Sequence, residues 1–197
     1  MAETNVPTNV VLTDIEDRPS FDLFSFMEMS HENRLGAATL NRLETLWEEW
    51  TSLFQAYLID TGKITYVCAW LPQSVEEQID KTWKVSSSEG FLMNSLAQFM
   101  CMSFIKLIMP EVEERGCAPS PRPTSTLRET LEKLGVPYKS ETSSLLSLQY
   151  ALVTHYPFRG GCEICHLQDH CPKGQGNVEE ASVVLPGYDS PLTSFPS

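Results

Sequence analysis

The chain has few basic residues for its size, and no run of lysine and arginine occurs in it. Its 14 Lys and Arg are outnumbered by 26 Asp and Glu, which gives a formal net charge of −12. Nucleic-acid affinity rests mostly on cations that neutralise the phosphate backbone, and an acidic surface repels phosphate. We therefore expect no general nucleic-acid binding, and partners that are proteins or metal-bearing ligands.

The N-terminal segment also lacks the marks of an export signal. MAETNVPTNVVLTDIEDRPS is acidic and polar, without the charged start, apolar middle and small-residue cleavage site of a secretory signal. We expect a cytoplasmic protein in which cysteines stay reduced, and reduced cysteines favour metal ligands or buried thiols over disulfides. The six cysteines are Cys68, Cys101, Cys117, Cys162, Cys165 and Cys171.

No internal repeat is visible, and 197 residues suffice for one ordinary domain but not for two independent ones. A content of 42% hydrophobic and 20% charged residues is typical of a globular chain rather than a disordered one. We expect a mainly α protein, a single helical domain with flexible termini and a small C-terminal metal module. The predicted parts are an N-terminal arm at 1–28, the helical domain at 29–154, the module at 155–172 and a tail at 173–197.

Apolar residues recur at steps of three and four in several segments, which is the period of one helical face. The pattern predicts a helix from Leu35 to Leu58 with Gly62 as its C-terminal cap. It predicts further helices near 74–83, 89–109 and 126–134 and another in SSLLSLQYALVTHY. The segment ITYVCAWL at 64–71 fits either a short strand or a buried helical turn.

The stretch 89–109 is the most apolar in the chain, and its length is close to the roughly 20 residues that span a bilayer. Asn94, Gln98 and Lys106 interrupt it, and no basic flank or second apolar segment accompanies it. We expect a buried central helix and no membrane span.

The most informative window is HYPFRGGCEICHLQDHCP, residues 155–172, which holds three of the six cysteines and three of the four histidines. Thiolate and imidazole are the ligands of zinc and of iron–sulfur clusters. The two-residue gap between Cys162 and Cys165 lets both sulfurs reach one metal, and Cys171 follows closely enough to return to the same centre. The sequence predicts an iron–sulfur cluster, or alternatively Zn, held by these three cysteines.

Three cysteines leave one ligand position to fill. His155 is our preferred candidate, which gives the spacing His-x6-Cys-x2-Cys-x5-Cys. His166 and His170 are other candidates, although each is crowded by a neighbouring cysteine. An open position that takes a substrate, water or a partner's ligand is the third alternative.

The spacing Cys-x2-Cys-x5-Cys resembles two known cluster motifs. The phrase GGCEICHLQDHCPKG is similar to the tail of the NifQ family, which supplies molybdenum for nitrogenase cofactor assembly and has a further Cys where this chain has Pro157. The cluster tail of the endonuclease III family of DNA glycosylases is similar to a lesser degree, with its first Cys at the position of His155. The resemblance implies a cluster of the 4Fe-4S type and a role in cofactor biosynthesis.

Other interpretations of the same residues stay open. Cys162 to His166 matches the haem attachment pattern Cys-x-x-Cys-His, Cys165 with a nearby histidine forms a nucleophile pair, and the thiols can also be plain surface groups. We predict an accessory protein that binds a metal or an iron–sulfur cluster and acts in metalloprotein or cofactor maturation on a client metalloenzyme or assembly factor. The alternatives are an enzyme or enzyme subunit that uses the cluster for electron transfer or substrate binding, and a structural zinc knuckle. The sequence does not decide whether the protein is catalytic.

Overall fold

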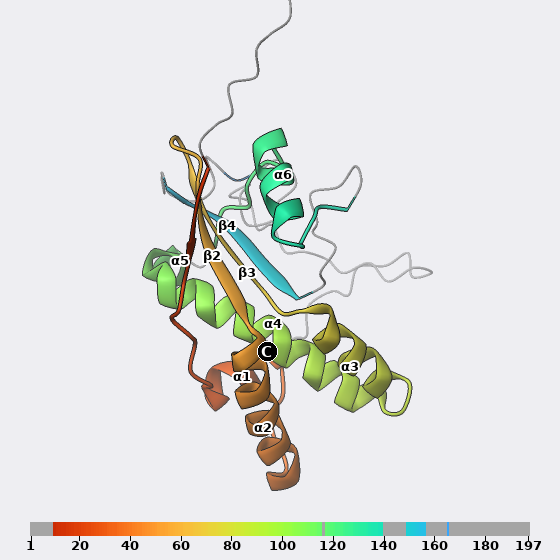
Figure 1. The fold of residues 1–197 in the computed structure, drawn as a ribbon. Coiled ribbons are helices and arrows are strands. Elements are labelled where there is room, and N and C mark those ends of the chain that lie inside the picture. The colour runs from red at the N-terminus through yellow and green to blue at the C-terminus, as the bar shows by residue number, and fades with distance from the viewer. Residues whose placement is uncertain (1–9, 116, 140–148, 157–164, 166–197) are drawn as a thin grey trace, which may run out of the picture. The chain divides into compact units, whose positions relative to one another are not determined.

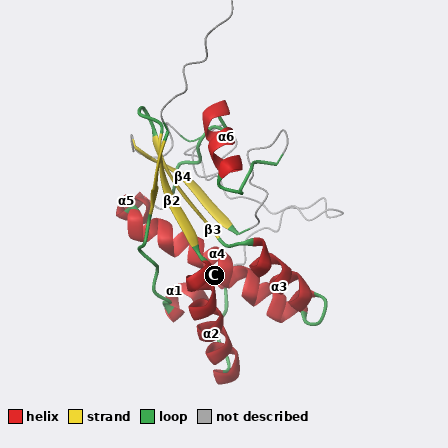
Figure 2. Cartoon of the chain, in the orientation of Figure 1, coloured by secondary structure: helices red, strands yellow, loops and turns green. Residues whose placement is uncertain are grey.

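A four-stranded antiparallel sheet runs through the protein, so the prediction of a mainly α domain was wrong (Figures 1 and 2). The computed structural model describes residues 10–115, 117–139, 149–156 and 165, all within one compact unit, Met1–His166. The strand order is β1-β2-β3-β4. The strands are β1 (Val11–Asp14), β2 (Gln55–Asp60), β3 (Thr65–Trp70) and β4 (Tyr150–Tyr156).

Helices cover the two faces of the sheet unequally. Helix α4 packs on β3 and β4, and most of the other helices lie on the same side of the sheet. Helix α6 lies on the opposite face (Figure 1). Because side chains alternate along a strand, Val67 and Ala69 of β3 enter the larger core and Cys68 and Trp70 enter the smaller one beneath α6. The helices are α1 (Leu23–Ser30), α2 (Ala37–Leu53), α3 (Gln73–Trp83), α4 (Ser87–Ile108), α5 (Pro110–Arg115) and α6 (Ser125–Lys133).

The predicted helix Leu35–Leu58 is really a helix followed by a strand. Helix α2 ends at Leu53, and β2 then pairs with β3 in the hairpin register Gln55↔Trp70 to Asp60↔Thr65. Gly62 does not cap a helix but sits in the hairpin turn with a φ of 80°, a conformation that favours glycine. The segment 64–71 therefore forms a strand rather than a helical turn, because its backbone pairs with β2 on one side and with β4 on the other.

The predicted helix in SSLLSLQYALVTHY is also wrong in its described part. Residues 150–156 form β4, while 140–148 lie outside the described residues. Four consecutive residues of β4 are buried, so the strand shows no alternation of polar and apolar positions. A short apolar run of this kind has no period that separates strand from helix, and pairing with β3 decides the outcome.

The central helix was predicted correctly. Helix α4 spans Ser87–Ile108, and its Phe104 and Leu96 are fully buried in the larger core. It is the one helix of the described residues that is long and apolar enough to cross a membrane, with a mean hydropathy of 1.5, and half of that apolar window is buried inside the protein. The helices near 74–83 and 126–134 are confirmed as α3 and α6.

The described part of the expected N-terminal arm contains a strand and most of a helix. Strand β1 forms one edge of the sheet through the register Val11↔Asp60 to Asp14↔Tyr57. Helix α1 follows, with Asp22 accepting a hydrogen bond from the Ser25 amide as its N-cap and with Phe26 fully buried. The arm is thus tied to the body by strand pairing and by the rings of Phe21 and Phe26, which pack against Phe99 of α4.

Candidate functional site

His155 lies at an irregularity near the end of β4. Thr65 of β3 pairs with Tyr156 and the next residue, Tyr66, pairs with Thr154, so His155 is an extra residue that faces no partner in β3. The Thr154 amide donates a 3.0 Å hydrogen bond to the Pro119 carbonyl, which holds the bulged strand from its outer side. Bulges of this kind turn a side chain in a new direction and are frequent beside functional sites.

The imidazole of His155 has an unsatisfied polar atom. Its Nδ1 is buried and has no hydrogen-bond partner among the described residues, although the residue as a whole is half-buried. A buried nitrogen without a partner costs about 1–3 kcal/mol, and a metal ion is one of the groups that an imidazole nitrogen binds. The donor therefore fits the ligand role that the sequence predicted for His155.

The remaining predicted ligands are only partly within the described structure. Cys165 is described and half-exposed, whereas Cys162 and Cys171 lie outside the described residues, as do His166 and His170. Within the described ranges, no group of three or more His, Cys, Asp or Glu side chains is arranged to hold a metal ion. The proposed set of His155, Cys162, Cys165 and Cys171 thus stays a prediction.

Two of the other cysteines, Cys68 and Cys101, are unsuited to a metal centre. Cys68 on β3 and Cys101 on α4 are fully buried in the core, and Cys117 is half-exposed after α5. Burial raises the pKa of the Cys68 thiol, and the charge interaction with neighbouring Cys101 raises it further. Burial also raises the pKa of Cys101, to about 12. Because the thiolate is the form that binds metal, Cys68 and Cys101 are packing residues.

A separate cleft of about 450 Å³ lies between the N-terminal halves of α2 and α4. Its two ionisable lining residues are Arg42 and Glu89, and the rest of its surface is apolar or carries small hydroxyl groups. The lining residues are Ala38, Thr39, Arg42, Leu43, Leu46, Ser88, Glu89, Leu92 and Met93.

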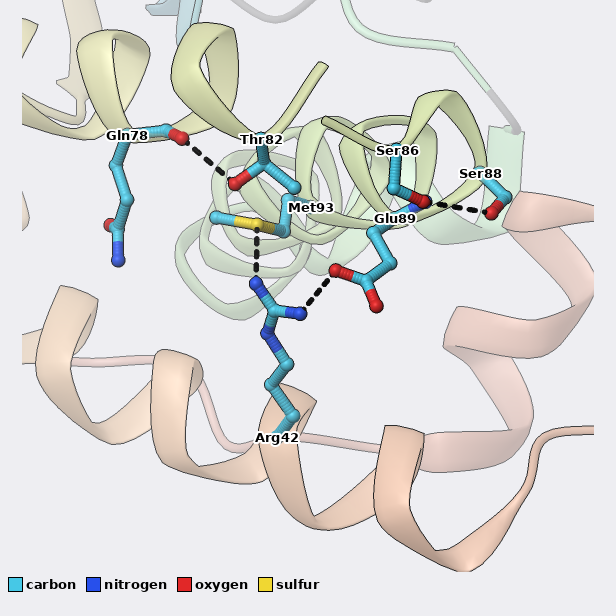
Figure 3. Close-up of polar contacts among 7 residues, drawn as sticks. All are labelled: Arg42, Gln78, Thr82, Ser86, Ser88, Glu89 and Met93. Atoms are coloured by element: carbon cyan, nitrogen blue, oxygen red, sulfur yellow. Dashed lines mark hydrogen bonds and ion pairs between the residues drawn. The ribbon is translucent and has the colours of Figure 1, made fainter. Parts of the chain in front are cut away.

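Arg42 reaches from α2 across this cleft to α4 (Figure 3). Its Nη1 pairs with the Glu89 carboxylate, and its Nη2 lies 3.7 Å from the Met93 sulfur. Both side chains of the ion pair are about half exposed, at 47% and 51%. The guanidinium therefore stands at the mouth of the cleft, between water and an apolar floor.

The local structure explains why Glu89 is free to pair with Arg42. Ser86 caps α4, and its hydroxyl oxygen accepts a hydrogen bond from the Glu89 amide at 3.4 Å. A Glu three residues after the cap often hydrogen-bonds in return to the backbone amide of the cap residue. Here the Ser86 amide already donates to the Thr82 carbonyl at 2.8 Å. The Glu89 carboxylate is consequently available to a partner on α2. No sequence pattern linked Arg42 with Glu89, because they are 47 positions apart and belong to different helices.

A second cleft of about 520 Å³ lies beside the end of β3 and the turn that follows α6. Trp70, Leu71 and Pro72 line one side, and Leu134, Gly135 and Val136 line another. Among the described lining residues, Glu76 is the one ionisable group, and none is a cation or a sequence-predicted ligand.

Comparison with known proteins gives no relative on which these sites can be mapped. No family model, curated protein or solved structure matches the chain. The assignment of function therefore depends on the chemistry of the residues themselves.

Proposed function

We propose that the protein is an accessory factor that binds a metal ion or an iron–sulfur cluster and acts in metalloprotein or cofactor maturation. The observation that carries the proposal is His155, which lies at a bulge of β4, seven residues before Cys162, and whose buried Nδ1 has no hydrogen-bond partner in the described part of the chain. A ligand at this nitrogen removes the cost of leaving it unsatisfied.

The donor set supports iron–sulfur or zinc over other metals. Three thiolates and one imidazole are soft and borderline ligands, which suit iron–sulfur clusters and zinc rather than magnesium or calcium. A cluster in this position supplies electron transfer or a labile metal site, whereas zinc supplies a fixed fold for the segment that carries the cysteines. In both cases His155 anchors the segment to the rigid end of β4.

The acidic charge of −12 supports a role with protein partners rather than nucleic acid. A client metalloenzyme or assembly factor is the partner that we propose. An enzyme or enzyme subunit that uses the cluster, and a structural zinc knuckle, are the competing functions. The bound metal separates the zinc knuckle from the rest, because an iron–sulfur protein purified without oxygen is brown and a zinc protein is colourless.

The experiment is a metal and sulfide measurement on anaerobically purified full-length protein and its variants. We expect Cys162→Ser, Cys165→Ser and Cys171→Ser each to lose most of the bound metal. We expect His155→Ala to lose metal or to make the centre labile to oxygen, and His155→Cys to retain it, because a thiolate can replace the imidazole.

Matched controls separate ligand loss from general damage. Cys117→Ser removes a half-exposed thiol outside the proposed set, and His31→Asn removes a histidine at the end of α1 while keeping a residue type that tolerates its φ of 57°. Both should keep the metal content of the wild type. Equal metal content in all of these variants, or loss in the controls alone, contradicts the proposal.

A further inference from the structure

The cleft between α2 and α4 has the chemistry of a ligand site that is independent of the cysteine segment. Its volume of about 450 Å³ lies in the range of small-molecule pockets, roughly 300–1,000 Å³. Such pockets are mostly apolar with a few polar groups that fix the orientation of the ligand. Leu43, Leu46, Leu92 and Met93 supply the apolar floor, and Arg42 is the polar group at its mouth.

Arg42 has donor capacity left over. A guanidinium carries five N–H donors in a planar fork, and the contacts of Arg42 within the described structure are one carboxylate oxygen of Glu89 and the Met93 sulfur. A thioether sulfur is a weak acceptor. The Nη2 group therefore faces the cleft without a strong acceptor, and a carboxylate supplies the bidentate geometry that the fork prefers.

The helix termini beside Arg42 favour an anion over a cation. Ala38 and Thr39 lie in the first turn of α2, whose N-cap, Gly36, provides no side-chain hydrogen bond, and Ser88 lies in the first turn of α4. Backbone N–H groups in a first turn have no intrahelical acceptor and carry partial positive charge. Together with the Arg42 guanidinium, these N–H groups are donors that an anion at the cleft mouth can use, and Glu89 is the one carboxylate among the described lining residues.

We propose that the α2–α4 cleft binds a small carboxylate with an apolar tail, whose carboxylate pairs with Arg42 and whose tail lies on Leu43, Leu46 and Met93. The Glu89 carboxylate occupies the place of the ligand's carboxylate in the free protein. Exposed ion pairs contribute only about 0–1 kcal/mol, so Glu89 can turn into water at little cost. The buried tail then supplies the affinity that Glu89, which is tethered to α4, cannot provide.

The test uses three probes that share an eight-carbon tail and differ in the head group: octanoate, 1-octanol and octylammonium. Each is titrated into the full-length protein below its micelle concentration, by calorimetry and by NMR of ¹³C-labelled methionine methyl groups. We expect octanoate to bind most tightly and to shift the Met93 methyl signal. Met102, an exposed residue of α4 that does not line the cleft, should not shift.

Two variants test the head-group contacts. Arg42→Gln should weaken octanoate binding by about tenfold or more, because it removes a charge-assisted hydrogen bond. Glu89→Gln should strengthen it by up to about fivefold, because it removes a weak internal competitor. The control is Lys106→Gln, which removes the cation of an ion pair between Lys106 of α4 and Glu113 of α5 at 3.5 Å. This substitution should leave octanoate affinity unchanged.

The opposite results overturn the proposal. Tighter binding of octylammonium, with a loss of affinity in Glu89→Gln, makes the cleft a cation site. Equal binding of all three probes shows that the head group is not recognised. Absence of any saturable Met93 shift shows that the cleft is not a ligand site. Unfolding midpoints of the variants should stay near that of the wild type, since both substituted side chains are about half exposed.

Discussion

The indole Nε1 of Trp50 donates a 2.9 Å hydrogen bond to the Oε1 of Gln78 and so joins α2 to α3. Trp50 is 1% exposed and is one of the largest buried side chains in the protein. A buried indole N–H needs an acceptor, because leaving it unpaired costs the free energy of its lost hydration. This contact is a polar link between α2 and α3, which both pack on the larger core.

Gln78→Leu should therefore lower the free energy of unfolding by about 1–3 kcal/mol, because it leaves the Trp50 N–H buried without an acceptor. The measurement is urea unfolding followed by tryptophan fluorescence and by circular dichroism. The control on the same helix is Gln73→Leu. The exposed Gln73 side chain donates to Glu77 at 3.3 Å, and its replacement should change stability by less than about 0.5 kcal/mol. Equal effects in the two variants would mean that the Trp50 contact contributes nothing.

Gly90, in the first turn of α4, packs closely against Trp83 at the end of α3. A Cβ added there lies 2.6 Å from Cδ2, 2.7 Å from Cγ and 2.9 Å from Cα of Trp83. We expect Gly90→Ala to destabilise the protein by about 1–3 kcal/mol through overpacking, although alanine by itself favours a helix by about 1 kcal/mol. In a Trp83→Ala background, where the indole atoms are absent, the same substitution should cost less. A stabilising effect of Gly90→Ala in the wild type would rule out the tight packing.

Stability should fall at alkaline pH because four buried acidic groups are held neutral. Burial raises the pKa of Tyr66, Cys68 and Tyr138 and raises that of Cys101 to about 12. The unfolded chain loses thiol protons from about pH 9.0, the ordinary value, while the folded chain keeps them. Because the unfolded state then binds fewer protons, these groups add no pH dependence well below that pH and decrease the free energy of unfolding as pH rises above it.

Urea unfolding at a series of pH values around and above 9 measures this decrease. Cys101→Ala removes one of the buried thiols, so its free energy of unfolding should decrease less steeply with alkaline pH than that of the wild type. The comparison uses slopes, because the substitution also changes packing at every pH. An identical slope in the variant would show that Cys101 is not protected from ionisation in the folded protein.

The sequence located the helices whose signals are local. The long apolar run of α4 and the apolar spacing of α6 arise from residues that are near one another along the chain, and Gly135 adopts the left-handed conformation that is common after a helix, with a φ of 81°. The predicted helix through 54–58 failed because the residues that continue the apolar period of α2 are those that β2 uses. Periodicity describes which residues are apolar, but it does not reveal that the backbone has found a partner strand.

The sequence by itself determined the acidic charge, the positions of the main helices and the gathering of cysteines and histidines in 155–172. Only the tertiary structure decided that β2, β3 and β4 are strands, that His155 is the unpaired residue of a bulge, and that Arg42 meets Glu89 across a cleft. The physical reason is that helix signals and ligand spacing arise from neighbours along the chain. Strand pairing, bulges and contacts between helices depend on residues that are far apart in sequence and meet only when the core forms.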